Sequence, residues 1–209
     1  HLTTRRQRQM CIRDRMERNS QSSIRQRLWR IRAKHVILAT GAIERPLVFA
    51  GNDIPGVMLC SAALEFYKLY GVSPGDRVVV LTNNDSAYSS VIELFNAGIS
   101  VPLVIDVREK SDGNLPLKAK KLGIRVEFSK AISKVIGKKK VKAVELCSVV
   151  GEGAVLETII CDSVLMSGGW TSTLNLWSHC GGKIKWDSKL NTLVPDESCL
   201  LYTSDAADE

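Results

Sequence analysis

The sequence has little of what metal centres and membrane anchors need. Its 209 residues include three histidines and six cysteines, and no two cysteines form a Cys-x-x-Cys pair. That spacing leaves no zinc signature and no disulfide framework, so we expect no metal site and a reduced, cytoplasmic setting. Apolar runs stay shorter than the roughly 18 residues that a membrane-spanning helix needs. We therefore expect neither a metal centre nor a membrane anchor.

Aromatic residues are also scarce, at 6%, and this scarcity bears on the net charge of +7. Nucleic-acid-binding surfaces interleave basic residues with aromatic rings that stack on bases. The basic residues of this chain crowd between positions 118 and 142 with almost no aromatic side chains between them, and we interpret them as a solvated helix face and a hairpin turn. We expect no nucleic-acid partner. These lysines are Lys118, Lys120, Lys121, Lys130, Lys134, Lys138, Lys139, Lys140 and Lys142.

The two ends of the chain differ in composition from the rest. Codons can be chosen for RRQRQMCIRD (5–14) and CLLYTSDAAD (199–208) that make the two segments reverse complements of each other. A sequencing adapter joined to both ends of a DNA fragment produces that relation, whereas two protein tails have no physical reason for it. We therefore expect residues 1–15 and 199–209 to be adapter-derived. A basic N-terminal arm is the alternative interpretation of RRQRQ.

The remaining sequence predicts strands and helices in alternation. The segment Leu28–Ala39 favours a strand or a pair of strands, and its last part, HVILA, is apolar on both faces, which is typical of a buried parallel strand. Ser61 could cap a helix that Gly71 ends. Farther along we expect a strand at 77–81, a helix at 86–96, strands at 101–106 and 125–128 with a short helix at 117–122 between them, then strands at 132–136, 141–146, 155–160 and 163–166 and a helix to Trp177.

This order predicts an α/β fold: a Rossmann-like parallel βαβ sheet with antiparallel hairpin additions. Ligands of such sheets bind at the carboxyl ends of the strands. The first such end is Ala39, Thr40 and Gly41, where a glycine lets backbone approach a bulky ligand closely. Glu44 and Arg45, just beyond it, could act in catalysis, but charged neighbours beside a chain crossover are more often a structural ion pair, and we interpret them so.

The second strand end is Asn83, Asn84 and Asp85, where a dinucleotide fold would have its glycine loop. No glycine occurs from 82 to 96, so backbone cannot wrap closely around a pyrophosphate there. Asp106, at the end of the next strand, stands where a working fold binds a ribose. The alternative is a βαβ unit that serves packing and subunit contact.

Four longer strings carry a resemblance to a known family. They are ATGAIERPLVFAGNDIPGVM (39–58), GVSPGDRVVVLTNNDSAY (71–88), VIDVREK (104–110) and LMSGGWTSTLNLWSHCGGKIKWD (165–187). Over nearly all of Leu28–Asp187 the chain resembles the α subunits of heterotetrameric sarcosine oxidase, within the superfamily of flavoproteins with two dinucleotide-binding domains. The family usually continues SGGW with Asn-Pro-Thr, whereas this chain has Thr171-Ser172-Thr173.

The resemblance implies a flavoenzyme that oxidises sarcosine to glycine, with hydrogen peroxide and formaldehyde or methylenetetrahydrofolate as products. The α subunit would bind NAD beside Ala39, Thr40 and Gly41, and a partner subunit would carry FAD and FMN. Tetrahydrofolate would bind a downstream domain. The G-x-G-x-x-G fingerprint is absent and is expected upstream of Met16. Because the flavin carries the redox chemistry, no catalytic residue is assigned.

In this interpretation residues 16–56 are the C-terminal part of a first dinucleotide-binding domain, 57–162 an inserted second Rossmann-like domain, and 163–198 the return to the first. Two alternatives remain. One is a subunit of a related opine or cyanide-forming FAD/NAD(P)-dependent dehydrogenase, which shares the A-T-G-x-x-E-R-P stretch. The other is a non-catalytic scaffold subunit with degenerate nucleotide folds.

Overall fold

The structure is a computed structural model that describes residue 29 and residues 31–196. The chain divides into two units, with the boundary between Ala39 and Thr40. The segments predicted to be adapter-derived, 1–15 and 199–209, lie outside the described residues.

In the first unit, residues 31–39 form no regular secondary structure and are exposed, Ile37 to 91%. The strand predicted over Leu28–Ala39 is therefore wrong for this part. The described residues of this unit include no second strand, and a lone strand gains neither ladder hydrogen bonds nor an apolar surface to cover its side chains. Apolar sequence was not sufficient to make a strand here.

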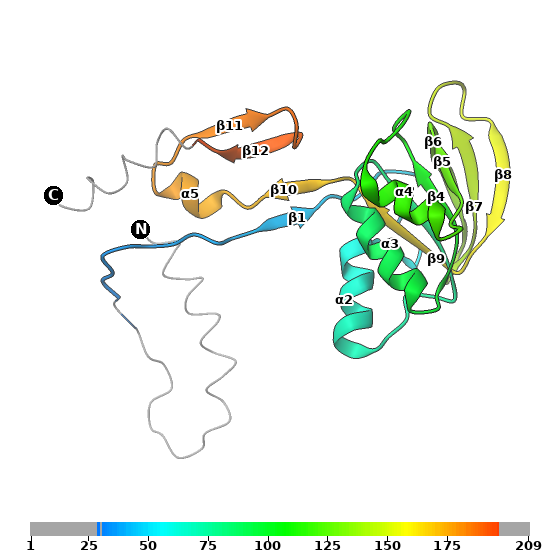
Figure 1. Ribbon diagram of the computed structural model, residues 1–209, viewed down its shortest axis with the longest axis horizontal. Helices are drawn as coiled ribbons and strands as arrows, with labels where there is room; N and C mark the ends of the chain where they lie inside the picture. Colours follow the sequence, from blue (N-terminus) through cyan, green and yellow to red (C-terminus); the bar gives the residue numbers. More distant parts are fainter. Residues whose placement is uncertain (1–28, 30, 197–209) are drawn as a thin grey trace, which may run out of the picture. The chain divides into compact units, whose positions relative to one another are not determined.

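The second unit is built in three layers around a five-stranded parallel sheet (Figure 1). The order is β2-β9-β3-β4-β5, with β2 at Val57–Leu59, β9 at Ser163–Ser167, β3 at Arg77–Thr82, β4 at Ser100–Asp106 and β5 at Val126–Phe128. One face is covered by α2 (Cys60–Tyr70), α3 (Ser86–Asn96) and α4 (Asn114–Lys121). The other face packs on an antiparallel sheet of β6 (Lys130–Gly137), β7 (Val141–Ser148) and β8 (Val155–Ile160).

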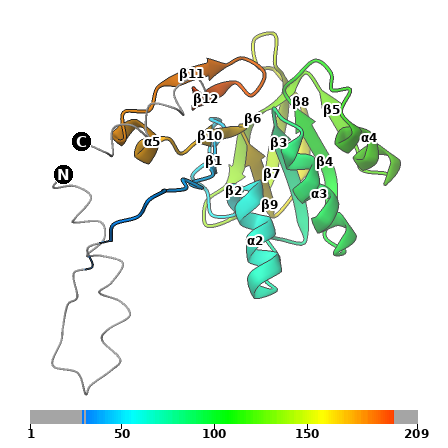
Figure 2. The ribbon, with the colours of Figure 1, turned by 60° about the vertical axis from the view of Figure 1, so that its left-hand side comes forward.

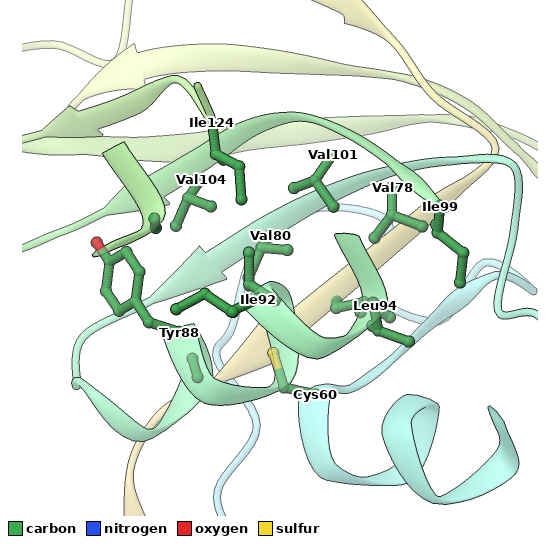
Figure 3. Packing of buried hydrophobic residues seen from close by; sticks show 14 of the residues in the cluster. Cys60, Val78, Val80, Tyr88, Ile92, Leu94, Ile99, Val101, Val104 and Ile124 are labelled. Carbon is green, nitrogen blue, oxygen red and sulfur yellow. The ribbon is translucent and has the colours of Figure 1, made fainter. Parts of the chain in front are cut away.

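The position of β3 between two layers explains the apolar residues in its sequence, RVVVL. Successive side chains of a strand point to opposite faces. Val78 and Val80 belong to the helix-side core (Figure 3), whereas Val79 and Leu81 belong to the core beneath the antiparallel sheet. A strand buried on both faces needs apolar residues at every position, so the continuous run is a requirement of the three-layer arrangement.

The predicted βαβ unit is confirmed, since β3 and β4 pair in parallel and α3 connects them. Gly71 ends α2 in the left-handed conformation, as predicted, with φ 63°. The α/β class with antiparallel additions is also confirmed. However, β9 follows the expected domain boundary after Asp162 and yet lies between β2 and β3 in the same sheet, and the exact domain limits stay a prediction.

Shorter elements complete the second unit. Sequence reasoning missed an antiparallel ribbon, in which β1 (Ala42–Glu44) and β10 (Trp170–Ser172) run side by side (Figure 2). The helix predicted to reach Trp177 is α5 (Asn175–His179), and a hairpin of β11 (Ile184–Asp187) and β12 (Thr192–Pro195) follows. Among the described residues, no helix combines the length and the apolar character needed to cross a membrane.

Candidate functional site

The second predicted strand end is assembled as the sequence suggested. Because β3, β4 and β9 are parallel and adjacent, their carboxyl ends meet at one edge of the sheet, where Thr82 is in register with Asp106 on one side and Ser167 on the other. Asn83, Asn84 and Asp85 follow Thr82 directly and share this edge. We call these three residues and Asp106 the strand-end cluster.

Asn84 lies at the start of α3, the part of a dinucleotide-binding fold that holds the pyrophosphate. Its side-chain Oδ1 accepts hydrogen bonds from Ser86 N at 3.1 Å, from Ser86 Oγ at 2.6 Å and from Ala87 N at 3.4 Å, so it caps α3. Amides at the start of this helix are the groups that hold phosphate in dinucleotide-binding folds. In this chain a side chain of the protein itself uses them.

The same side chain also crosses the edge of the sheet. Asn84 Nδ2 donates to Ser167 O at 3.1 Å and to Ser167 Oγ at 3.0 Å, and to Asn83 Oδ1 at 3.1 Å. This places an amide across the space between the ends of β3 and β9. A side chain with six hydrogen-bonding contacts at 3.4 Å or less is held firmly, so Asn84 links the ends of β3 and β9 to the start of α3.

Asp106 is likewise occupied by protein groups. Its carboxylate is fully buried and accepts hydrogen bonds from Tyr88 Oη at 2.8 Å and from Arg108 N, Nε and Nη2 at 3.1, 3.0 and 2.7 Å. Arg108 also donates to Asp85 Oδ1 at 2.7 Å, and Ser111 Oγ donates to the same oxygen at 2.9 Å. The predicted ribose-binding oxygens are therefore engaged by an internal ion-pair network.

Electrostatics hold this network in one protonation state. Burial, followed by the adjacent Asp106 carboxylate, raises the pKa of the Tyr88 phenol well above its usual value. Hydrogen bonds to Asp106 raise the pKa of the Arg108 guanidinium despite partial burial. The phenol thus stays a proton donor and the guanidinium stays charged. Sequence reasoning missed Arg108, although its place two residues after a strand-end acid was a signal that the two side chains could meet.

The first predicted strand end looks different. Ala39, Thr40 and Gly41 are exposed, and Gly41 is left-handed at φ 66° with no atom within 4 Å of where a Cβ would stand. Thr40 Oγ1 donates to Thr173 O at 2.6 Å, and Thr173 N donates to Gly41 O at 3.0 Å. This backbone is thus anchored on one side and open on the other. Since the β1–β10 ribbon separates Gly41 from the strand-end cluster, the structure does not bring the two predicted sites together.

The expected Glu44–Arg45 ion pair is wrong, because the two side chains make their hydrogen bonds with different parts of the chain. Glu44 is buried and accepts hydrogen bonds from Ser61 N at 2.9 Å and Ser61 Oγ at 2.6 Å, so it caps α2 in place of the expected Ser61. Arg45 Nη2 donates to Asn191 O at 3.3 Å. Within the described residues, no group of three or more histidine, cysteine or acidic side chains is arranged to hold a metal ion.

Comparison with known proteins finds relatives of this chain by sequence. No protein-family model matches the chain. It is 38% identical over 164 residues to the α subunit of sarcosine oxidase from Rhizobium meliloti (strain 1021), covering 78% of this chain and 16% of that protein. It is also 38% identical over 179 residues to the α subunit of sarcosine oxidase from Corynebacterium sp. (strain P-1), covering 82% and 18%. The chain thus spans less than a fifth of the length of these relatives.

A second group of relatives is more distant. One of the subunits of opine oxidase from Agrobacterium tumefaciens (strain Ach5) is 25% identical over 177 residues, which cover 77% of this chain and 35% of that protein. Because both groups match most of the chain, the higher identity favours the sarcosine oxidase relationship over the opine alternative.

Solved structures agree with the fold. Thioredoxin reductase of T. acidophilum matches with a TM-score of 0.55 at 21% identity, over 70% of this chain and 47% of that one. A FAD-dependent pyridine nucleotide-disulphide oxidoreductase from Desulfovibrio vulgaris matches with a TM-score of 0.54 at 17% identity, over 76% and 41%. The chain therefore has part of the fold of the two-dinucleotide-domain flavoproteins.

Proposed function

We propose, from its relationship to the α subunits of sarcosine oxidase over most of its length, that the chain is part of the dinucleotide-binding region of such a protein. The observation that carries this proposal is 38% identity to two of these subunits over about four fifths of the chain. The complete protein would then be an oxidoreductase that demethylates sarcosine to glycine, with hydrogen peroxide and formaldehyde or methylenetetrahydrofolate as products. It would act in the cytoplasm, within a heterotetramer.

The proposal places NAD at Ala39, Thr40 and Gly41 and not at the strand-end cluster. Two features of the cluster support this choice. Asn84 Oδ1 already accepts hydrogen bonds from the first amides of α3, and the carboxylate of Asp106 is already bonded to Tyr88 and Arg108. A dinucleotide would have to displace all of these contacts. The backbone at Gly41, by contrast, is open to a ligand.

The remaining cofactors would be held elsewhere in the enzyme. FAD and FMN on a partner subunit would supply the redox chemistry, and tetrahydrofolate would bind a downstream domain. In this scheme the residues described here position a nucleotide and support the assembly. The βαβ unit around the strand-end cluster would serve packing.

Two glycines allow a matched test of the NAD site in the complete protein, expressed from the uninterrupted gene with its partner chains. Gly41 and Gly71 have nearly equal φ, 66° and 63°, and a Cβ at either would meet nothing within 4 Å. The substitutions Gly41→Ala and Gly71→Ala should therefore cost similar stability, about 1 kcal/mol each. Only Gly41→Ala should weaken NAD retention, measured by equilibrium dialysis. Equal weakening by both would assign the effect to backbone strain, and no effect of either would remove the site from Gly41.

The same protein preparation distinguishes the proposal from its two alternatives, an opine-oxidising subunit and a non-catalytic scaffold. Sarcosine-dependent release of hydrogen peroxide supports the proposal, whereas turnover of an opine without turnover of sarcosine would favour the opine-oxidising relatives. If the assembled protein retains no NAD or ADP-ribose at all, the scaffold alternative replaces the cofactor-binding part of the proposal.

A further inference from the structure

Arg45 is an arginine whose charge is not balanced by any ion pair in the described part of the chain. No carboxylate among those residues lies within 4.0 Å of its nitrogens, and its Nε is buried without a hydrogen-bond partner. The one side-chain hydrogen bond that it makes with a described residue, from Nη2 to Asn191 O, is long at 3.3 Å. A buried donor left unpaired destabilises a protein, and more so on a charged group. The guanidinium therefore has bonding capacity that the described residues do not use.

The backbone around Arg45 holds this side chain in place. Arg45 N donates to Gly169 O at 2.8 Å, and Gly168 N donates to Arg45 O at 2.7 Å. A Cβ added at Gly169 would stand 2.8 Å from Nη2 and 3.7 Å from Cζ of Arg45, so the guanidinium lies directly against the glycine. Any side chain at position 169 would push it away. The absence of a side chain there thus keeps the charged group beside the end of β9.

Arg45 lies at the other end of β1 from the proposed nucleotide site. β1 spans Ala42–Glu44, so Gly41 directly precedes it and Arg45 directly follows it. Within β1, Glu44 is buried and Ile43 is 65% exposed. The chain from Gly41 to Arg45 spans at most about 13 Å when extended, a distance that an extended dinucleotide can span. This stretch therefore has an open backbone at one end, an exposed apolar side chain in the middle and a cation at the other end.

We propose that Arg45 binds a phosphate group of the nucleotide, which lies along β1 between Gly41 and Arg45. A guanidinium presents paired donors that match two oxygens of a phosphate. Binding gives the guanidinium the strong acceptor that it lacks. This inference rests on the proposed nucleotide binding at Gly41, and it adds the group that holds the phosphate.

The test measures binding of pyrophosphate and of ADP-ribose by isothermal titration to the complete protein freed of bound nucleotide. Arg45→Met should weaken both about tenfold or more, because a charged donor to phosphate is lost. Arg45→Lys, which keeps the charge without the fork, should fall between Arg45→Met and the unaltered protein. Arg77→Met is the matched control, since Arg77 lies at the opposite end of β3 and its Nε donates to Ile160 O. It should leave binding unchanged.

The outcomes separate this inference from the cofactor proposal. If ADP-ribose binding falls with Gly41→Ala but not with Arg45→Met, the phosphate assignment is wrong and the nucleotide site stands. Alternatively, pyrophosphate binding could depend on Arg45 while Gly41→Ala leaves ADP-ribose binding unchanged. Arg45 would then be an anion-binding site, and the placement of the cofactor at Gly41 would be wrong. Unchanged binding of both probes by Arg45→Met overturns the inference outright.

A second measurement uses the unaltered protein, so it does not depend on a variant that folds. Phenylglyoxal modifies arginines, and peptide mass spectrometry reports the modification of each one. ADP-ribose should slow the modification of Arg45 and leave that of Arg77 unchanged. Modification of Arg45 at the same rate with and without ADP-ribose would show that the phosphate does not bind Arg45. Resistance of Arg45 to phenylglyoxal in the absence of nucleotide, because a carboxylate of the protein already pairs with it, would show the same.

Discussion

Replacing Tyr88 by phenylalanine tests whether the strand-end cluster is a closed structural network. Tyr88 is fully buried, and its hydroxyl donates to Asp106 Oδ2 at 2.8 Å. The substitution removes one oxygen and leaves the ring and its packing in place (Figure 3). What it tests is therefore the hydrogen bond to the buried carboxylate.

The expected loss follows from the charge of the acceptor. A hydrogen bond to an ionised group contributes roughly 1.5–3 kcal/mol, and Asp106 keeps its three contacts with Arg108. Tyr88→Phe should therefore lower the free energy of unfolding by about 2 kcal/mol. Because the pKa of Tyr88 is raised above that of an unfolded tyrosine, about 10, its stabilisation is fully present below pH ~10 and is lost as the pH rises further.

Urea denaturation followed by circular dichroism measures this difference in free energy. Tyr67→Phe is the matched control, since Tyr67 is half-buried on α2 and its hydroxyl makes no hydrogen bond with a described residue; its effect should stay within about 0.5 kcal/mol. The difference between Tyr88→Phe and the unaltered chain should be constant from about pH 6 to about pH 9. A loss no larger than that of Tyr67→Phe would refute the view that Asp106 relies on Tyr88.

Asn84→Ala should lower the free energy of unfolding by about 1–2 kcal/mol because it removes the cap of α3, whereas Asn84→Asp should recover the cap but not the contacts with Ser167; equal losses in urea denaturation would contradict the capping role. Glu44→Gln should cost about 1 kcal/mol at the start of α2, measured as a shift of the thermal midpoint, and an unchanged midpoint would show that the charge is not needed there. Burial, followed by Asp162, raises the pKa of the Cys161 thiol to about 12. At about pH 8 iodoacetamide should therefore alkylate the exposed Cys180 and spare Cys161, as read by mass spectrometry, and comparable labelling of both would contradict the buried, protonated state of Cys161.

The βαβ unit could be predicted because its signals are local. A continuous apolar run at 78–81, a polar loop and a helix that follows without glycine are sufficient to indicate β3 and α3. The strand predicted at Leu28–Ala39 failed over its described part, residues 31–39, for the opposite reason. Its last part, HVILA, is largely apolar, but a strand is stabilised by neighbouring strands, and the described residues of its unit contain none.

The sequence predicted which residues form the site but not the hydrogen bonds that they make. Asn84 and Asp106 were expected at one edge of the sheet because carboxyl ends of parallel strands meet there. Their partners come from elsewhere: Tyr88 reaches Asp106 from α3, and Ser167 reaches Asn84 from β9, more than eighty residues later in the chain. Spacing along the sequence does not specify such contacts.

The sequence by itself indicated the βαβ unit and the antiparallel strands after it, because the length and alternation of apolar runs favour particular segments as strands. Only the tertiary structure decided that β9 inserts between β2 and β3, and that insertion brings Ser167 to Asn84 and Gly168 to Arg45. The physical reason is that hydrogen bonds and ion pairs depend on distances of about 3 Å between atoms. Those distances exist only once segments far apart in the chain have packed together.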